Sequence, residues 1–294
     1  MLNLLSKLLA FFSLRAVQAM GAGVAKFIHF VSPSYYKLLR ENLTISGLFA
    51  KQADFEQAVK TNIAETGKGI FESLKIWQMS DAEAASLVKN IYGWDCVETA
   101  IAAKKGIIFL TPHLGCFEIT SIYYAAQQPI TVLYRPPRQR SLEPLIVKGR
   151  SKGLVKLAPA NASGVRLLMQ ALKKGEAIGI LPDQLPASGE GEWTEFFGKP
   201  AYTMTLASKI AEKTGAQVIM AFGKRLSVGK GYELYLTPLA AGTIATPALL
   251  NQSIETQIKQ CPEQYLWRYN RYKTSENARA KQREQAENRG EKLE

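Results

Sequence analysis

The sequence predicts an α/β fold in which a mostly parallel central sheet is flanked by helices, with a membrane-associated helix at the N-terminus. Short apolar runs alternate with stretches of helical periodicity between residues 99 and 240. The 294-residue chain is 47% hydrophobic, enough to bury one large core. We expect an N-terminal anchor helix over residues 1–31, a single α/β domain over residues 32–275 and a charged, flexible tail over residues 276–294.

The N-terminal segment is apolar but carries three cations. Lys7, Arg15 and Lys26 interrupt it, so no stretch of 18 residues is free of charge as a plain transmembrane helix prefers. At about 100° per residue the cations fall on one stripe of a helix, and leucines and phenylalanines occupy the other sides. Such a helix lies among lipid headgroups, or spans marginally with its long side chains snorkelling. An ordinary core helix with one solvent-exposed edge is the alternative.

Two helices are predicted before the alternating region. Apolar residues at three- and four-residue spacing favour helices over Asp54–Trp77 and Asp81–Lys89, with Asp54 and Asp81 as N-caps. We expect them to form a helical layer against the sheet.

The alternating region supplies the predicted strands and crossover helices. The strand-like runs are Ile107–Thr111, Ile130–Tyr134, Leu154–Leu157, Ala177–Leu181, Val218–Phe222 and Tyr232–Leu236. Helices are predicted at Phe117–Ala126, Ala162–Lys174 and Thr203–Lys213. Neither a G-x-G-x-x-G nor a Walker A sequence occurs, so the common nucleotide-binding folds have no support.

The chain is strongly basic. Its formal charge of +12 and pI near 9.5 imply an anionic partner, which charge alone leaves as nucleic acid, an acidic protein or a phosphate-bearing membrane surface. The three cysteines, Cys96, Cys116 and Cys261, are widely spaced and form no Cys/His cluster. We therefore expect a reducing compartment and no metal.

The strand-like run Ile107–Thr111 ends just before a histidine. His113 follows it, and Glu118 lies five residues further on, an H-x4-E spacing. A neutral imidazole takes a proton from a hydroxyl, and a carboxylate on its other nitrogen fixes the tautomer and stabilises the imidazolium. The pair predicts activation of an alcohol nucleophile, although the spacing alone also fits a histidine satisfied at a strand end.

Further polar side chains follow two other predicted strands. Arg135 and Arg138 flank two prolines after Ile130–Tyr134, a suitable arrangement for phosphate or carboxylate, with a solvated basic face as the alternative. Asp183 and Gln184 follow Ala177–Leu181 and are suited to orienting another site residue or an acceptor hydroxyl, with a simple Asx turn as the alternative.

Aromatic and basic residues alternate near the C-terminus, over Gln264–Lys273. Such a stretch is typical of surfaces that stack on nucleic-acid bases, and equally of a membrane interface.

Taken in order, these motifs resemble the bacterial lauroyl/myristoyl acyltransferases of lipid A biosynthesis, a branch of the lysophospholipid acyltransferase superfamily. The similarity rests on Thr-Pro-His113-x4-Glu118, on Tyr-Arg135-Pro-Pro, on Leu-Pro-Asp183-Gln184, on Phe-Phe-Gly-Lys-Pro-Ala at 196–201 and on Gln-Tyr-Leu-Trp at 264–267. It runs from the N-terminal anchor to about Lys273.

The resemblance implies an inner-membrane enzyme facing the cytoplasm that moves a fatty acyl chain from acyl carrier protein to a hydroxyl of a lipid A precursor, without a cofactor. His113 would be the general base and Glu118 its orienting partner. Arg135 would lie near the acceptor phosphate or the developing oxyanion, with Asp183 supporting the site. Many relatives carry His or Arg where this chain has Asn270, so we assign no catalytic role to this position.

Two other classes of protein remain as alternatives. A nucleic-acid-binding protein fits the charge and the stretch near residue 270, but explains neither the apolar N-terminus nor the His113–Glu118 pair. A non-catalytic lipid-binding protein is disfavoured because both members of that pair are present. We therefore expect acyl carrier protein, a lipid A precursor and the inner membrane as partners, and no nucleic acid.

Overall fold

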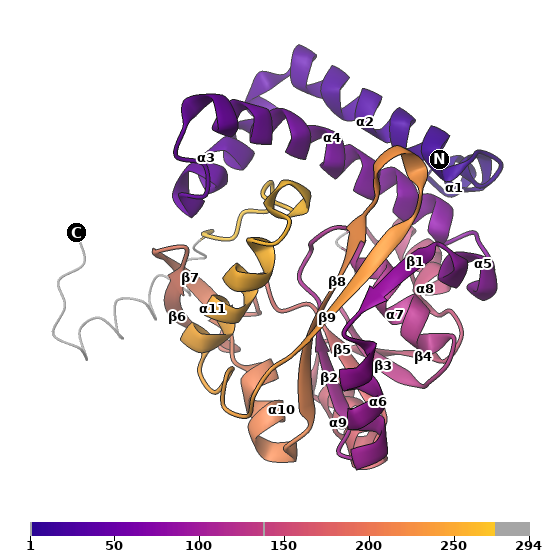
Figure 1. Ribbon diagram of the computed structural model, residues 1–294, viewed down its shortest axis with the longest axis vertical. Coiled ribbons are helices and arrows are strands. Elements are labelled where there is room, and N and C mark those ends of the chain that lie inside the picture. Colours follow the sequence, from indigo (N-terminus) through magenta and orange to yellow (C-terminus); the bar gives the residue numbers. More distant parts are fainter. Residues whose placement is uncertain (1, 138, 274–294) are drawn as a thin grey trace, which may run out of the picture.

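The computed structural model describes residues 2–137 and 139–273. Figure 1 shows a layer of N-terminal helices lying across one end of a twisted sheet, with further helices on both faces of that sheet. The charged tail expected at 276–294 lies outside the described residues, as does Arg138.

The central sheet has seven strands in the order β1-β9-β8-β2-β5-β3-β4. The neighbours β8, β2, β5, β3 and β4 are parallel, which confirms the prediction of a mostly parallel sheet. The strands are β1 Val88–Tyr92, β2 Ile107–Leu110, β3 Ile130–Tyr134, β4 Val155–Pro159, β5 Ala177–Ile180, β8 Gln217–Arg225 and β9 Tyr232–Pro238.

The sheet departs from the prediction at one edge. β9 runs antiparallel to β8, and β1 joins β9 in parallel. Residues 226–231 are too few for a crossover connection, so the chain reverses there instead. The helix predicted over Asp81–Lys89 is wrong in its last three residues. α5 (Asp81–Ser86) ends early because Val88–Tyr92 pairs with the open edge of β9.

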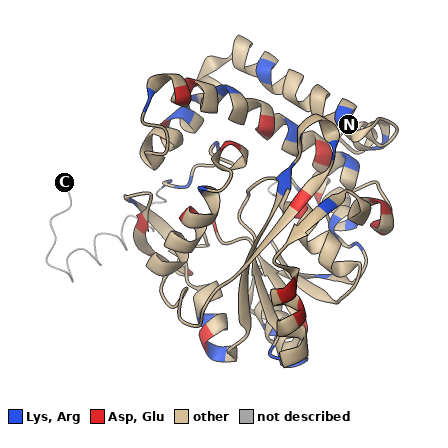
Figure 2. Ribbon diagram, in the orientation of Figure 1, with Lys and Arg blue, Asp and Glu red and all other residues tan. Residues whose placement is uncertain are grey.

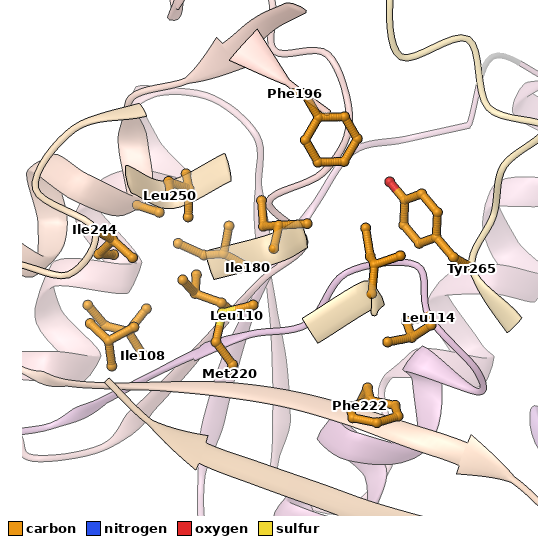
Figure 3. Close-up of a cluster of buried hydrophobic side chains, with 14 of the residues drawn as sticks. Ile108, Leu110, Leu114, Ile180, Phe196, Met220, Phe222, Ile244, Leu250 and Tyr265 are labelled. Carbon is orange, nitrogen blue, oxygen red and sulfur yellow. The ribbon is translucent and has the colours of Figure 1, made fainter. Parts of the chain in front are cut away.

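The two middle strands are buried on both faces. Every residue of β2 and β5 is inaccessible, as expected of parallel strands covered on both sides. Alternate residues enter different clusters: Ile108 and Leu110 join one core, whereas Ile107 and Phe109 join another. Figure 3 shows the first cluster, where side chains of β2, β5 and β8 pack together.

Six helices cover the faces of the sheet: α6 Trp94–Ala103, α7 Phe117–Ala125, α8 Glu143–Arg150, α9 Ala162–Lys173, α10 Leu206–Thr214 and α11 Pro247–Ile258. The predictions for α7 and α9 are confirmed, and α10 begins only at Leu206. Its predicted start belongs instead to a hairpin of β6 (Gly191–Phe196) and β7 (Lys199–Met204), turned at Phe197 and Gly198 with positive φ at both residues.

The helical layer consists of α1 Leu2–Ala10, α2 Leu14–Val31, α3 Lys37–Ser46 and α4 Gln52–Ile76. α4 confirms the helix predicted from Asp54, but its N-cap is Lys51. The cap expected at Asp81 is likewise Ser80, which forms a capping box with Glu83.

The expected single N-terminal helix is broken into two. The hydroxyl of Ser13 accepts a hydrogen bond from the N–H of Ala16 and so begins α2 separately. Within the described part of the chain, no helix has the length and apolarity needed to cross a bilayer. The marginally spanning form of the predicted anchor is therefore unsupported.

α2 packs lengthwise on α4 (Figure 1). A side chain on Gly21 would collide with the backbone of Gly67, so the two helices approach closely at this pair. Gln18 on α2 also donates a hydrogen bond to Glu72 on α4, at 2.8 Å. The N-terminal segment is thus packed onto the rest of the protein.

Candidate active site

His113 lies just beyond the carboxyl end of β2, as the sequence predicts, in a tightly held loop. The loop turns at Gly115, whose φ is +61° and where a Cβ would collide with the carbonyl oxygen of Gly223. The N–H of Cys116 donates to that oxygen at 2.8 Å, and the N–H of Gly115 donates to the carbonyl of Gln264 at 3.0 Å. These contacts set the position of the histidine relative to the sheet.

Asp183 is the carboxylate that contacts His113. Nδ1 of the imidazole lies 2.9 Å from Oδ1 of Asp183, and the backbone N–H of His113 donates to Oδ2, also at 2.9 Å. The register of the sheet explains the contact. Leu110 on β2 is paired with Ile180 on β5, and both site residues lie three positions beyond this pair.

Asp183 is held as an anion although it is 2% exposed. Burial by itself opposes ionisation. The charge that the His113 ring carries when it is protonated, together with the hydrogen bonds from its side chain and backbone, nevertheless holds the pKa of the Asp183 carboxyl below its ordinary value. A carboxylate at this place fixes the proton of the imidazole on Nδ1.

Gln184 occupies the other side of the imidazole. Its amide Nε2 lies 3.1 Å from Nε2 of His113. Because Nδ1–H donates to Asp183, Nε2 carries the lone pair and accepts from the amide. The structure therefore brings together His113, Asp183 and Gln184, three of the residues selected from the sequence.

Glu118 does not make the contact expected of it. Its carboxylate, 4% exposed, forms a bidentate ion pair with Arg150, with distances of 2.9 Å from Nε and 2.6 Å from Nη2 to Oε1. The chain turns at Gly115 and enters α7, which points Glu118 toward the end of α8 and away from Nδ1. The hydrogen-bonding partner of His113 is Asp183, so the proposed His113–Glu118 contact is wrong.

Arg150 is the functional candidate that sequence reasoning missed. In the sequence it is one of seven basic residues between Arg135 and Lys156, with nothing local to distinguish it. Burial alone would lower its pKa. The charge and hydrogen bonds of Glu118 instead raise the pKa of the guanidinium above its ordinary value. A permanent cation is therefore held beside the catalytic histidine candidate.

A cavity of about 710 Å³ opens beside these residues. His113, Gln184 and Arg150 contribute to its wall, and Leu133, Ile146 and Leu206 are among its apolar lining. A narrower apolar pocket of about 30 Å³ shares Arg150 with it. A basic imidazole nitrogen, a fixed cation and an apolar space of this size suit a reaction on the polar end of a lipid-like substrate.

Comparison with known proteins identifies the family. The sequence matches the model for bacterial lipid A biosynthesis acyltransferases over residues 1–274. The chain belongs to this family. It is 25% identical to the lipid A biosynthesis lauroyltransferase of Escherichia coli K12 over 264 residues, which are 88% of this chain and 85% of that protein. It is also 25% identical to the palmitoleoyltransferase of the same strain over 242 residues, 81% of this chain and 78% of that protein.

Arg135 lies at the rim of the acyltransferase cavity. It is exposed, lines the opening and donates to the carbonyl of Leu185 at 3.4 Å. Its exposed guanidinium is available to an anionic ligand. Arg138, expected to act with it, lies outside the described residues.

The aromatic stretch near the C-terminus of the acyltransferase is largely internal. Tyr265 and Trp267 are buried, and the indole N–H of Trp267 donates to the carbonyl of Pro262 at 2.7 Å. Buried rings have no free face for stacking on bases, so this stretch no longer supports the nucleic-acid interpretation.

Cys116 follows His113 closely, but it is not activated as a nucleophile. Burial and the nearby carboxylates raise the pKa of its thiol well above the ordinary value. The protonated thiol gives no support to an acyl-enzyme intermediate.

Proposed function

We propose that this member of the lipid A acyltransferase family transfers a fatty acyl chain from an acyl carrier protein thioester to a hydroxyl of a lipid A precursor. The observation that carries the proposal is His113, with Nδ1 held by Asp183 and Nε2 at the wall of a large cavity. The imidazole has the protonation pattern of a general base, and the cavity has the size and apolar lining for an acyl donor.

The reaction in this proposal is a direct transfer. The acceptor hydroxyl takes the place of the Gln184 amide at Nε2 of His113, which accepts the proton as the oxygen attacks the thioester carbonyl. A C–O bond forms, the C–S bond breaks, and the imidazolium returns the proton to the departing thiolate. Asp183 stabilises the imidazolium throughout.

Arg150 supplies the positive charge at the cavity wall. We assign it to the oxyanion that develops on the thioester carbonyl, because a fixed cation away from bulk water stabilises charge without reorganising. Glu118 then acts by orienting Arg150, whereas the sequence predicted that it would orient His113. The exposed Arg135 contacts a phosphate of the acceptor, with Arg138, three residues further along the sequence, as a further candidate.

We also propose that the enzyme works at the cytoplasmic face of the bacterial inner membrane. α1 and α2 carry cations but no acidic side chains (Figure 2). Phe11, between the two helices, and Phe27 and Phe30 of α2 are exposed rings, 86%, 64% and 82% accessible. Exposed rings beside lysine and arginine are typical of helices that lie in the headgroup layer. The net charge of +12 also favours an acidic carrier protein.

The central test is acyl transfer by the purified protein. A lipid A precursor dispersed in detergent is mixed with a panel of acyl carrier protein thioesters, and the products are weighed by mass spectrometry. We expect a product heavier by one acyl chain, and a loss of about 10²-fold or more in His113→Ala. His29→Ala, which removes the other histidine of the chain, is the control. No product from any thioester, or full activity in His113→Ala, would contradict the proposal.

The membrane assignment is tested separately by flotation with anionic vesicles. Phe27→Glu/Phe30→Glu should release the protein from vesicles, since two charges replace two exposed rings worth about 1.5–3 kcal/mol each when buried. Leu154→Glu, a matched substitution of an exposed apolar residue ahead of β4, should leave binding unchanged. Equal binding by the parent protein, the Phe27→Glu/Phe30→Glu variant and the Leu154→Glu variant would show that α2 does not bind the membrane.

A further inference from the structure

The C-terminal segment over residues 262–272 lies against the loop that carries His113. The N–H of Leu266 donates to the carbonyl of His113 at 3.0 Å, and Tyr265 forms an antiparallel bridge with Leu114. In Figure 3 Tyr265 lies beside Leu114 at one end of the buried cluster. The segment is therefore bonded to the backbone of the loop with the proposed base.

The same segment is also bonded to the loop that carries Asp183 and Gln184. The hydroxyl of Tyr269 accepts a hydrogen bond from the N–H of Leu185 at 3.0 Å. The two members of the His113–Asp183 pair follow different strands, β2 and β5. One short segment thus holds both of the loops that bring the pair together.

The hydrogen bond from Tyr269 is made at the peptide group that joins Gln184 to Leu185. A peptide group is planar, so an acceptor on its N–H fixes the orientation of the whole unit. The carbonyl of Leu185 accepts from Arg135 at 3.4 Å, and Pro186 disfavours a helical conformation for the residue before it. The chain directly after Gln184 is consequently held at both of its polar groups.

The backbone that presents the Tyr269 hydroxyl is itself fixed. The side-chain amide of Asn42 on α3 donates to the carbonyls of Trp267 and Tyr269, at 2.6 and 2.9 Å. The N–H of Tyr269 donates to the carbonyl of Leu266 at 3.0 Å. Because its backbone is bonded on both sides, Tyr269 provides a firm support for the loop.

The start of the segment is tied to α4 and β8. Asn62 on α4 donates to the carbonyls of Glu263 and Tyr265, at 2.8 and 2.7 Å. The side chain of Gln264 accepts from the N–H of Arg225 at 2.8 Å and donates to its carbonyl at 3.0 Å. The segment therefore connects the catalytic loops to the rigid elements behind them.

We propose that Tyr269 is a positioning residue of the acyl-transfer site, whose hydroxyl holds the peptide after Gln184 so that Asp183 and Gln184 stay at the two nitrogens of His113. These consecutive residues lie 2.9 Å from Nδ1 and 3.1 Å from Nε2, so a rotation of the chain between them displaces both. The proposal rests on the proposed function, because Tyr269 acts through the His113–Asp183 pair.

Removal of the Tyr269 hydroxyl should change the tautomer of the imidazole. The N–H of Leu185 then loses its acceptor, and the loop occupies conformations in which Asp183 has left Nδ1. In those conformations the proton of the neutral ring is free to move to Nε2. A ring with its proton on Nε2 has no lone pair there for the acceptor hydroxyl, so kcat falls.

The kinetic experiment compares Tyr269→Phe with Tyr272→Phe. Phenylalanine keeps the aromatic ring and removes only the hydroxyl. Tyr272 belongs to the same segment, but its hydroxyl donates to the carbonyl of Phe196 in β6, at 2.9 Å. We expect Tyr269→Phe to lower kcat about 3- to 10-fold, the effect of one neutral hydrogen bond, at unchanged KM for both substrates. Tyr272→Phe should leave both constants unchanged.

The tautomer is measured directly, without acyl transfer, by ¹⁵N NMR of protein labelled at histidine. His113 and His29 are the two histidines of the chain, so His29→Ala assigns the signals. At a pH where the ring is neutral, the parent and Tyr272→Phe should show the proton of His113 on Nδ1. Asp183→Asn should show it on Nε2, and Tyr269→Phe should show a mixture of the two forms.

A double variant tests whether Tyr269 acts through Asp183. If it does, Asp183→Asn/Tyr269→Phe should be no slower than Asp183→Asn alone. The proposal would be overturned by an unchanged kcat or a parent-like tautomer in Tyr269→Phe, or by losses that multiply in the double variant. Full activity in His113→Ala would instead show that the proposed function is wrong, while the NMR comparison, which needs no substrate, still tests the contact of Tyr269 with the loop.

Discussion

Replacing Asp183 by asparagine tests the geometry on which the mechanism depends. The carboxylate accepts two hydrogen bonds from His113, one from the ring and one from the backbone. An amide has one oxygen for these two donors. If that oxygen keeps the backbone N–H, the amide NH₂ faces Nδ1, which must then become an acceptor. The proton moves to Nε2, and the imidazole has no lone pair for the substrate hydroxyl.

The size of the effect follows from the 2.9 Å separation of Nδ1 and Oδ1. Two unit charges at this distance interact by about 6 kcal/mol at an effective dielectric constant of about 20. This energy is gained only when the imidazolium forms, and each 1.4 kcal/mol is worth about tenfold in rate. The upper limit is therefore about 10⁴-fold, and we expect a loss of roughly 10³- to 10⁴-fold in kcat.

The assay is single-turnover acyl transfer at saturating acceptor, with circular dichroism to confirm folding. Asp95→Asn, an exposed aspartate in the first turn of α6, is the matched control and should retain full activity. Asp183→Asn with a rate within about tenfold of the parent would refute the assignment of the orienting carboxylate. The loss of activity should also persist across the pH range, because a wrong tautomer is not corrected by titration.

Three further outcomes are expected. Glu118→Gln breaks the buried pair with Arg150 and should lower the free energy of unfolding in urea by about 2–4 kcal/mol along with activity; unchanged stability and rate would show that the pair is dispensable. Gly115→Ala should cost about 1–3 kcal/mol in backbone strain and abolish transfer, whereas Gly242→Ala, also at positive φ but in open space, should cost only stability. Because the pKa of Asp183 is lower when folded, the stability that its ionisation contributes is present above about pH 4 and lost as the pH falls through the folded-state pKa. The unfolding free energies of wild type and Asp183→Asn should therefore converge below pH 4. A difference in unfolding free energy that stays constant with pH would show that the ionised Asp183 carboxylate does not stabilise the fold.

The positions of the site residues were predictable because they depend on local pattern and on one rule of parallel sheets. Apolar runs bounded by glycine or proline identify β2, β3 and β5, and the carboxyl ends of parallel strands meet at one edge. His113, Asp183 and Gln184 each follow such a run. Their meeting at that edge therefore required no knowledge of how the helices pack.

The N-terminal segment shows what a pattern of apolar and basic residues can predict and what it cannot. Its apolar surface and basic residues can be recognised in the sequence, and the exposure of Phe11 between α1 and α2 and of Phe27 and Phe30 in α2 agrees with them. The break at Ser13 depends on one side-chain cap, and the burial of the inner face depends on the glycine contact with α4. Periodicity describes one helix at a time and does not reveal what the helix packs against.

The choice of partners within the site was decided by tertiary structure. Glu118 is five residues from His113, yet it pairs with Arg150, 32 residues away, because the turn at Gly115 and the position of α8 beside β4 set where the two charged side chains meet. The N–H of Leu266 donates to the carbonyl of His113, and Tyr265 bridges to Leu114, only because the C-terminal segment returns to the loop that follows β2. Local sequence thus determines which chemical groups end at the edge of the sheet. Which carboxylate meets which cation depends on long-range packing, because side-chain contacts follow the direction of the backbone and not the spacing along the chain.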